Sequence, residues 1–276
     1  MRIIHLSDLH FGHHDPVLAE GLAADIASQA PDLVVVSGDF AQIGSRREFA
    51  DARAFLDQLS TPVFAVPGNH DVPARNVLRR FLDPYGYYRR FIAEELEPFT
   101  EIDGVAIAGI NTARRLRLGL NWALGSINRE QLADLEHRFA AASPDAVRVV
   151  VAHHPLLQPE TTMEHPMQPV KRADLALQTF ARLGVRLVLS GHFHMSYVRR
   201  HDHPGEIGEA VPKGPRHAAA APILVAQASS TISTRLRGEP NAYNLIDIVD
   251  RVITVTVREW RGEDGWTTRE KASERA

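Results

Sequence analysis

Apolar residues occur along most of the chain in short runs that alternate with longer, amphipathic segments. Residues 2–6 and 32–36 are nearly all apolar, which is typical of buried strands. Residues 16–29 between them begin with a proline and have apolar side chains at helical spacing. Those side chains are Val17, Leu18, Leu22 and Ile26.

The same alternation continues as far as residue 189. Further strands are expected at residues 62–66, 104–110, 147–151 and 185–189. Further helices are expected after Ser45, after Asn128 and over residues 173–183. Ser45 and Glu48 have the spacing of a capping box, in which each side chain accepts a backbone N–H of the other residue.

The last third of the chain has few helix signals. Residues 196–200, 222–226, 242–249 and 252–260 have the pattern of strands, and residues 201–221 form a loop rich in Pro, Gly and His. The polar residues 261–276 are expected to be a frayed tail. Residues 78–97, rich in Arg, Tyr and Phe, are expected to be helical and interrupt the alternation, so they are a candidate cap over residues 75–97.

These elements predict an α/β fold, a two-sheet β-sandwich flanked by helices, whose second half is weighted to antiparallel strands. We expect one domain over residues 1–260. The cap, if it lies beside a site, offers Phe81, Tyr85, Tyr87, Tyr88 and Phe91 to line a pocket. The alternative, which we favour for most of these residues, is that they pack the cap onto the sheet.

The composition narrows the chemistry that the chain can carry. There is no Cys among the 276 residues, so disulfides, thiolate metal sites and Cys nucleophiles are excluded. A formal net charge of −3 gives no general attraction to nucleic acid or to an anionic membrane. No apolar run is long enough to cross a bilayer and the N-terminus lacks a signal-peptide pattern, so we expect a cytoplasmic protein.

Five short polar segments each follow one of the predicted strands. They are S-D-L-H at residues 7–10, G-D at 38–39, G-N-H-D at 68–71, H-H-P at 153–155 and G-H-F-H at 191–194. Loops beyond the carboxyl ends of strands converge at one edge of an α/β sheet, so we expect these segments to meet there. Asp, Asn and His ligands without Cys fit divalent metals such as Mn, Fe, Zn or Co.

Taken in order, these segments resemble the motif series of the calcineurin-like metallophosphoesterase superfamily, D-x-H, G-D, G-N-H-D, H-H-P and G-H-x-H. The resemblance covers residues 3–194 and implies a four-layer αββα fold with a metal site at the carboxyl ends of the strands. It also implies hydrolysis of a phosphoric ester by a hydroxide held between two metal ions.

The resemblance assigns roles to individual residues. One metal ion would be held by Asp8, His10, Asp39 and His194. The other would be held by Asp39, Asn69, His153 and His192, with Asp39 shared. His70 would stand over the substrate and protonate the leaving oxygen or stabilise the developing charge, with Asp71 orienting it.

Several other polar residues are open to more than one interpretation. His154 competes with His153 as a ligand, and His153 is favoured because it stands at the strand exit. His154, Arg114 and Arg235 are candidate substrate contacts, because the arginines follow strands near the expected site and a guanidinium grips phosphate well. His5, on the first strand, is expected to be a hydrogen-bonded core residue.

Departures from other branches narrow the resemblance. Gln42 stands where purple acid phosphatases have a Tyr, and the chain lacks the D-R-G segment of the Ser/Thr protein phosphatases. The branch left is that of bacterial cyclic-nucleotide phosphodiesterases and glycerophosphodiesterases. It implies a small-molecule phosphodiester substrate, with a 3′,5′-cyclic nucleotide such as cAMP as the leading candidate and a glycerophosphodiester as the alternative.

Functions of another class stay open as alternatives. A metal-binding scaffold without turnover would need the ligands but not His70, and a nuclease would need a basic surface that the net charge does not indicate. We therefore expect neither nucleic acid nor a membrane as a partner. The sequence does not set the oligomeric state, and a homo-oligomer stays open.

Overall fold

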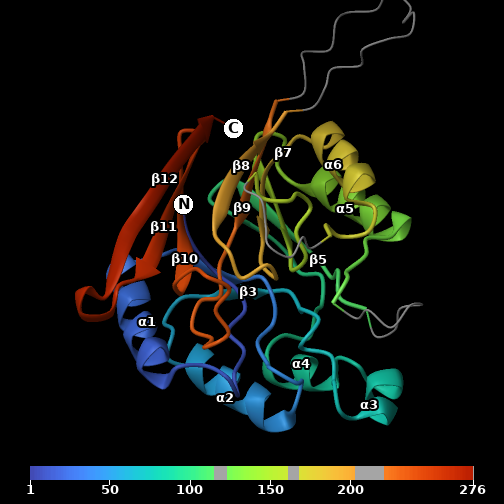
Figure 1. Ribbon diagram of the computed structural model, residues 1–276. Coiled ribbons are helices and arrows are strands. Elements are labelled where there is room, and N and C mark those ends of the chain that lie inside the picture. Colours follow the sequence, from blue (N-terminus) through green and yellow to red (C-terminus); the bar gives the residue numbers. More distant parts are fainter. Residues whose placement is uncertain (115–122, 161–167, 203–220, 276) are drawn as a thin grey trace, which may run out of the picture.

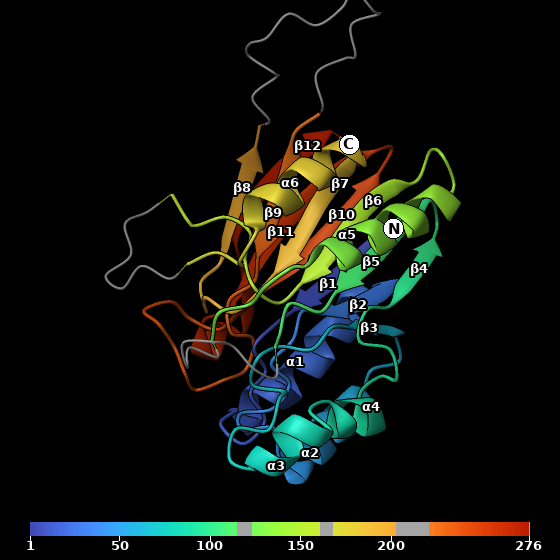
Figure 2. The same cartoon turned by 90° about the vertical axis from the view of Figure 1, so that its right-hand side faces the viewer.

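The layers follow from the alternation of apolar side chains along each strand. The computed structural model describes residues 1–114, 123–160, 168–202 and 221–275, which form two mixed six-stranded sheets packed face to face (Figure 1). Helices cover both outer faces (Figure 2). The predicted α/β sandwich is therefore confirmed.

The first sheet contains both ends of the chain. Its order is β12-β11-β10-β1-β2-β3, and β1 to β3 run parallel whereas β10, β11 and β12 are joined antiparallel. The strands are β1 (Arg2–Leu6), β2 (Leu33–Val36), β3 (Val63–Ala65), β10 (Ala242–Val249), β11 (Val252–Trp260) and β12 (Trp266–Arg275).

The second sheet is built from the middle of the chain. Its order is β4-β5-β6-β7-β9-β8, with β5, β6, β7 and β9 parallel and an antiparallel strand at each edge. The strands are β4 (Phe99–Ile102), β5 (Val105–Ile110), β6 (Val147–Ala152), β7 (Val185–Ser190), β8 (Tyr197–His201) and β9 (Ile223–Gln227).

Alternate residues of one strand belong to different cores. Ile3 of β1 lies between the sheets, and its neighbour Ile4 packs against α1 (Pro16–Gln29) and α2 (Arg46–Leu56). On the second sheet, Val149 of β6 lies between the sheets and Val150 packs against α5 (Arg129–Ala141) and α6 (Ala173–Arg182). The inner strands thus have two apolar faces, which explains why the sequence shows continuous apolar runs there.

The helix signals are largely confirmed. Ser45 and Glu48 form the predicted capping box of α2, and Asn128 with Gln131 forms another at the start of α5. On α1 the predicted face is buried at Leu18, Leu22 and Ile26, but Val17 is 68% exposed. None of the described helices is long and apolar enough to cross a bilayer.

The C-terminal tail and one strand differ from what the sequence predicts. Residues 261–276 were expected to be frayed, yet η1 (Gly262–Asp264) turns the chain back and β12 pairs with β11 along its length. The buried Trp266 pairs with Trp260 at the start of this hairpin. The charged residues that follow are typical of an edge strand, and in the sequence alone they resemble a polar tail. The strand β4 was missed, and residues 203–220 of the predicted loop lie outside the described residues.

The predicted cap helix is divided into two short helices, α3 (Val77–Leu82) and α4 (Gly86–Phe91). The break falls at Pro84, which cannot donate a helix hydrogen bond. Tyr88 is fully buried against Phe40, and the Tyr85 hydroxyl donates to the Ala113 carbonyl at 3.0 Å. These aromatic side chains therefore pack the segment onto the core, the alternative that the sequence favoured over a pocket lining.

Candidate metal centre

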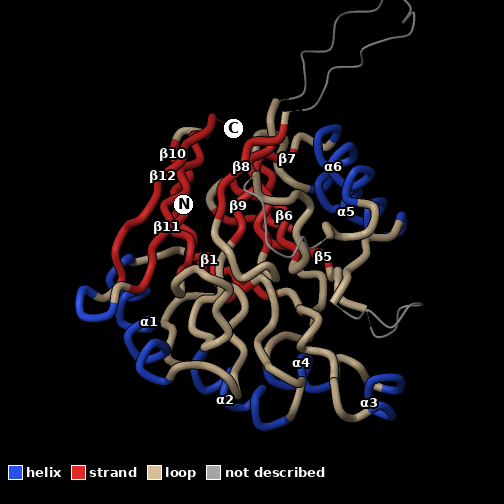
Figure 3. Tube along the Cα trace, in the orientation of Figure 1, coloured by secondary structure: helices blue, strands red, loops and turns tan. Residues whose placement is uncertain are grey.

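The five polar segments meet at one end of the sandwich, where the loops that follow the strands gather (Figure 3). Backbone hydrogen bonds tie the loops together across the sheets. Asp8 N donates to the Gly38 carbonyl at 3.1 Å, and Gly191 N donates to the His153 carbonyl at 2.9 Å. The relative positions of the loops are therefore set by the backbone as well as by the side chains.

Many of the polar residues in these loops have a left-handed backbone conformation. Among the described residues, positive φ occurs at ten positions other than Gly, and five of them are Asp8, His10, Asp39, His192 and His194. Such a conformation costs on the order of 1 kcal/mol for each residue and collects at functional sites. No pattern in the sequence indicates these conformations, although Asp and His are among the residues that tolerate them.

Glycine is required where two loops touch. A Cβ on Gly191 would lie 1.7 Å from Ser7 Oγ, and a Cβ on Gly68 would lie 2.1 Å from Asp39 Oδ1. Gly38 has a φ of +95°, which only Gly adopts readily. These glycines therefore allow the loops to approach each other closely just before the ligand residues.

Asp8 is placed so that its two carboxylate oxygens have different roles. Oδ2 accepts the Ser7 hydroxyl at 2.7 Å and His192 N at 2.8 Å. Oδ1 is buried and makes no hydrogen bond, and it lies 3.2 Å from His194 Nε2 and 3.6 Å from His10 Nε2. One oxygen is therefore held by the protein while the other faces two imidazole nitrogens.

The two carboxylate oxygens of Asp39 also have different roles. Asp39 lies between two clusters of side chains, one of Asp8, His10 and His194 and one of Asn69, His153 and His192. Oδ1 accepts His70 N at 2.8 Å, and Oδ2 is buried without a hydrogen bond. Oδ2 lies 3.2 Å from His153 Nε2 and 3.9 Å from His10 Nε2, so this single oxygen faces both clusters. Because Oδ1 already accepts a backbone N–H, Oδ2 is the oxygen through which Asp39 would be shared.

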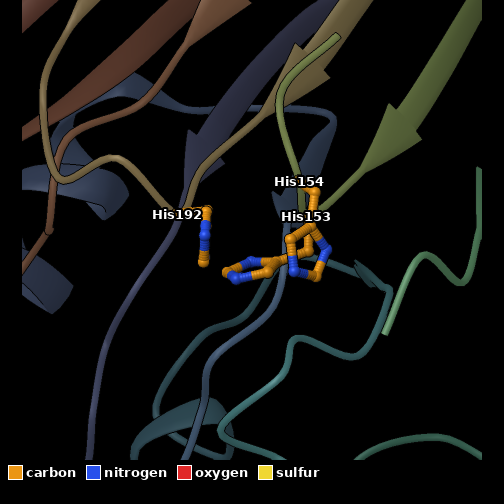
Figure 4. A group of neighbouring side chains, drawn as sticks. All are labelled: His153, His154 and His192. Atoms are coloured by element: carbon orange, nitrogen blue, oxygen red, sulfur yellow. The ribbon is translucent and has the colours of Figure 1, made fainter. Parts of the chain in front are cut away.

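The second cluster is completed by side chains from three loops. Asn69 Oδ1 lies 3.2 Å from His153 Nε2. The His192 ring lies 5.1 Å from the His153 ring between centroids, and Figure 4 shows the histidines of the loops after β6 and β7 side by side. The structure thus brings together all seven side chains that the resemblance assigned to metal ions.

His154 is held away from the ligand positions, although His153, His154 and His192 cluster together. Its Nδ1 lies 2.7 Å from Thr112 Oγ1 and its Nε2 lies 3.1 Å from the Ala123 carbonyl. Because both ring nitrogens have protein partners, this residue is better placed to support the loop than to bind metal or substrate.

The imidazoles are oriented from behind by carbonyl groups. His153 Nδ1 donates to the Ser37 carbonyl at 2.7 Å, and His194 Nδ1 donates to the Arg235 carbonyl at 2.8 Å. Each bond keeps a proton on Nδ1 and directs Nε2 toward the cluster, as in metal sites. His5 lies below, with its Nε2 2.9 Å from the Ser37 hydroxyl, and is the hydrogen-bonded core residue that the sequence indicated.

The donor set fits two metal ions. Ligand atoms about 2.1 Å from one ion are roughly 3.0–3.4 Å apart, close to the 3.2 and 3.3 Å spacings of His194 Nε2 from Asp8 Oδ1 and from His10 Nε2. The two buried carboxylate oxygens have no hydrogen bond, so bound cations would stabilise them. Burial opposes ionisation of Asp8, but the neighbouring His194 and His10 hold its pKa well below the ordinary value.

His70 stands at the edge of this centre. Its Nδ1 lies 2.6 Å from the Gln42 carbonyl, which can only accept, so Nδ1 carries a proton. Its Nε2 points toward Arg235 Nη1 at 3.4 Å, and its ring meets that of His10 edge-on with centroids 4.8 Å apart. Gln42, which the sequence identified only as a departure from another branch, is therefore the group that orients His70.

Asp71 does not have the role that the resemblance assigned to it. Its oxygens accept the backbone N–H groups of Asp39 and Gly68 at 3.0 and 2.8 Å and of Ala41 at 3.0 Å. Burial and the Asp39 charge raise the pKa of this carboxyl group to about 8. Asp71 joins two of the site loops, and it does not orient His70.

Arg114 and Arg235, the two arginines that the sequence offered as substrate contacts, differ in what their guanidinium groups contact. The Arg114 guanidinium donates to protein acceptors on Asn111, Ala113, Ser126 and Gln131, so it stabilises a loop and is not available to a ligand. The Arg235 guanidinium lies beside His70. Ser7 was not singled out as a positioning residue, although its place between a buried strand and Asp8 could have indicated one.

A family model for calcineurin-like phosphoesterases matches residues 1–196. A probable cyclic nucleotide phosphodiesterase from a Synechococcus species is 27% identical over 182 residues, which are 66% of this chain and 65% of that protein. A glycerophosphodiester phosphodiesterase from Enterobacter lignolyticus is 38% identical over 82 residues, 26% of this chain and 30% of that protein. The matches thus span less than two-thirds of the length of either relative.

Among solved structures, a purple acid phosphatase from yellow lupin has the same fold. It superposes with a TM-score of 0.70 at 14% identity, over 99% of this chain and 53% of that one. At this identity the likeness concerns the fold alone.

Proposed function

The chain belongs to the calcineurin-like phosphoesterase family, and from this we propose that it is a two-metal hydrolase of small phosphodiesters. One observation carries the proposal. Asp8 Oδ1 and Asp39 Oδ2 are buried carboxylate oxygens without hydrogen bonds, each facing imidazole nitrogens from other loops. Burial of carboxylates is costly unless nearby positive charge compensates it, and two metal ions held between these ligands would supply that charge.

The residues divide between two ion positions. Asp8, His10 and His194 with Asp39 would hold one ion, and Asn69, His153 and His192 with Asp39 would hold the other. When bound, two such ions supply hydroxide from water at neutral pH and neutralise phosphoryl oxygens. Their identity among Mn, Fe, Zn and Co is set by availability and geometry rather than by these ligand types alone.

The reaction adds one water to a diester and gives a monoester and an alcohol. The P–O bond to the leaving group breaks as the water oxygen bonds to phosphorus, and one proton must reach the leaving oxygen. His70 is placed to deliver that proton or to stabilise the charge, because its Nδ1 donates to the Gln42 carbonyl and its ring lies beside that of His10 at the edge of the centre.

A 3′,5′-cyclic nucleotide is the substrate that we propose first, because the relative with the broader coverage is named as a probable cyclic nucleotide phosphodiesterase. A glycerophosphodiester is the second candidate, since the more identical but shorter match is to an enzyme of that name. We further propose that residues 1–275 act as one catalytic unit, because β12 belongs to the same sheet as β1.

The test is a substrate panel on protein reconstituted separately with Mn²⁺, Co²⁺ and Zn²⁺. It compares cAMP, a glycerophosphodiester, bis-p-nitrophenyl phosphate, p-nitrophenyl phosphate and single-stranded DNA. We expect kcat/KM for the diester bis-p-nitrophenyl phosphate to exceed that for the monoester by about tenfold, equivalent to about 1.4 kcal/mol. An Asp8→Asn variant serves as the control for metal-dependent turnover.

Preference for the monoester would refute the diesterase assignment and leave the broader one. Absence of turnover on every ester, with two ions bound, would refute the hydrolase proposal and favour a metal-binding scaffold.

A further inference from the structure

The segment between β9 and β10 reaches the metal centre from the C-terminal third of the chain. It lies outside residues 1–196, which the family model matches. Its residues 229–231 and 233 are buried Ser and Thr side chains, an unusual composition for a loop between two strands. The segment therefore has a role in the site that the shared motifs do not describe.

Hydrogen bonds fix this segment to both sides of the first ion position. Ser230 Oγ donates to the Asp8 carbonyl at 2.8 Å, and Thr231 N donates to the Ser7 carbonyl at 3.0 Å. Ser229 Oγ donates to the His194 carbonyl at 3.2 Å. The loop is thus held by its own serines and threonines, and it does not need the Arg235 side chain to stay in place.

The backbone of Arg235 belongs to the same arrangement. Its carbonyl accepts His194 Nδ1 at 2.8 Å, and its N–H donates to Ser233 Oγ at 3.1 Å. Because the backbone is held at both groups, the side chain starts from a fixed point next to a metal ligand. It extends to His70, whose Nε2 lies 3.4 Å from Nη1 of the guanidinium.

The guanidinium group has few partners at its end. Nη1 lies 3.4 Å from Gln42 Oε1 and 3.4 Å from His70 Nε2, both long for hydrogen bonds. In the described part of the chain no carboxylate forms an ion pair with Arg235, whereas Arg2, Arg258 and Arg269 all have one. The half-buried Arg235 guanidinium, with two long contacts, therefore contributes little to the stability of the fold.

We propose that Arg235 is a catalytic residue that binds a phosphoryl oxygen of the substrate beside His70. The proposal deepens the proposed function, on which it rests. A planar guanidinium offers two parallel N–H donors to two oxygens of a phosphate, and its charge favours the more negative transition state. The substrate would replace the two long contacts with Gln42 and His70 by short charged ones.

Arg235 and His70 would then contact the same phosphoryl group of the substrate from adjacent positions. His70 Nε2 serves the leaving oxygen, and Arg235 serves an oxygen that stays on phosphorus. Because the Arg235 carbonyl also orients His194, one residue connects a metal ligand with phosphate recognition.

The experiment compares wild type with Arg235→Gln and Arg235→Lys. Both variants keep the backbone bonds to His194 and Ser233, so we expect two metal ions per chain and an unchanged melting temperature. Arg235→Gln should lower kcat/KM by about 100-fold or more. Arg235→Lys should recover part of the rate, because it restores the charge but not the two-pronged geometry.

Two further readouts do not depend on turnover. Binding of inorganic phosphate to the metal-loaded protein, measured by calorimetry, should weaken at least tenfold in Arg235→Gln. Added guanidinium chloride at low concentration should restore activity to Arg235→Ala, where a space is left, and not to Arg235→Gln.

Arg182→Gln is the matched control, since it removes the same charge at the end of α6 that precedes β7, away from the strand ends that carry the site. It should leave rate and phosphate affinity unchanged.

The outcomes separate this proposal from the proposed function. If wild type turns over and Arg235→Gln keeps its metals with unchanged kcat/KM and phosphate affinity, Arg235 has no part in catalysis. If wild type turns over no ester, the hydrolase proposal fails, and the calorimetric comparison still decides whether Arg235 binds phosphate. Loss of metal in both Arg235→Gln and Arg235→Lys would show that the side chain maintains the fold and would overturn the proposal.

Discussion

Metal binding to this centre is expected to compete with a proton on His153. Burial acts to lower the pKa of His153, but the Asp39 carboxylate, 3.2 Å from its Nε2, raises it to about 9 in the metal-free protein. The same nitrogen must be unprotonated to bind a cation. At neutral pH the second ion therefore has to displace a proton from its own ligand.

The size of this effect on metal affinity follows from the difference between the pKa of His153 and the pH. At pH 7 about one molecule in a hundred has His153 unprotonated, so metal affinity should be about 100-fold weaker than at pH values well above 9. Between pH 6 and pH 8 the affinity of the second position should rise roughly tenfold for each pH unit. No such rise is expected from His5, whose pKa is lowered by burial to about 3.

The stability of the metal-free protein should change in the opposite sense. The folded pKa of His153 lies above the unfolded value near 6.5, so its ion pair with Asp39 stabilises the fold fully below pH 6.5. This contribution is lost as the pH rises through about 9. Thermal unfolding of metal-free wild type should therefore show falling stability from pH 6.5 to 9.

Calorimetric titration with Co²⁺ or Zn²⁺ in buffers of different ionisation enthalpy counts the protons released. We expect about one proton from this position at pH 7 and close to none at pH 10. Asp39→Asn is the control for the unfolding series, because it removes the carboxylate that raises the His153 pKa and should flatten the pH dependence. A histidine resonance of His153 that titrates at or below 6.5 in the metal-free protein would refute the reasoning.

Three further predictions concern single side chains. Asp39→Ala should abolish binding of both ions, as measured by elemental analysis, because Oδ2 faces both clusters; retention of one ion would contradict a shared oxygen. His70→Ala should keep two ions and lose about 10²–10⁴ in kcat, with a smaller loss for p-nitrophenolate leaving groups if it acts as an acid; an equal loss for poor and good leaving groups would point to charge stabilisation instead. Asp71→Asn should lower the free energy of unfolding by about 1–3 kcal/mol, because its amide nitrogen would face a backbone N–H; chemical denaturation that shows no change would argue against its role between the loops.

The sequence predicted most of the fold because the apolar runs are long and fully buried. The runs at residues 2–6, 242–249 and 252–260 became strands with the expected ends, since each has apolar partners on one or both faces. The edge strand β12 was not predictable by the same means. Its charged residues are held by pairing with β11, which is a tertiary contact that local composition does not encode.

The candidate site, too, was predictable from the sequence only in part. Motifs at strand ends identified which side chains meet, because parallel strands deliver their loops to the same edge. They could not show which oxygen of Asp39 is free, since that depends on the backbone N–H of His70. Nor could they show that Gln42 rather than Asp71 orients His70, because that bond is made by a carbonyl group, which every residue has.

The left-handed conformations of the ligand residues also bear on how this protein could be stabilised. Asp8 and Asp39 combine a left-handed backbone conformation with a buried side chain, and the backbone conformation burdens the metal-free fold. Directed evolution that selects only for heat resistance without metal should therefore accumulate Gly or Asn at these positions, trading activity for stability. Selection carried out with metal in excess should keep both aspartates, because the bound ions then supply the compensating energy.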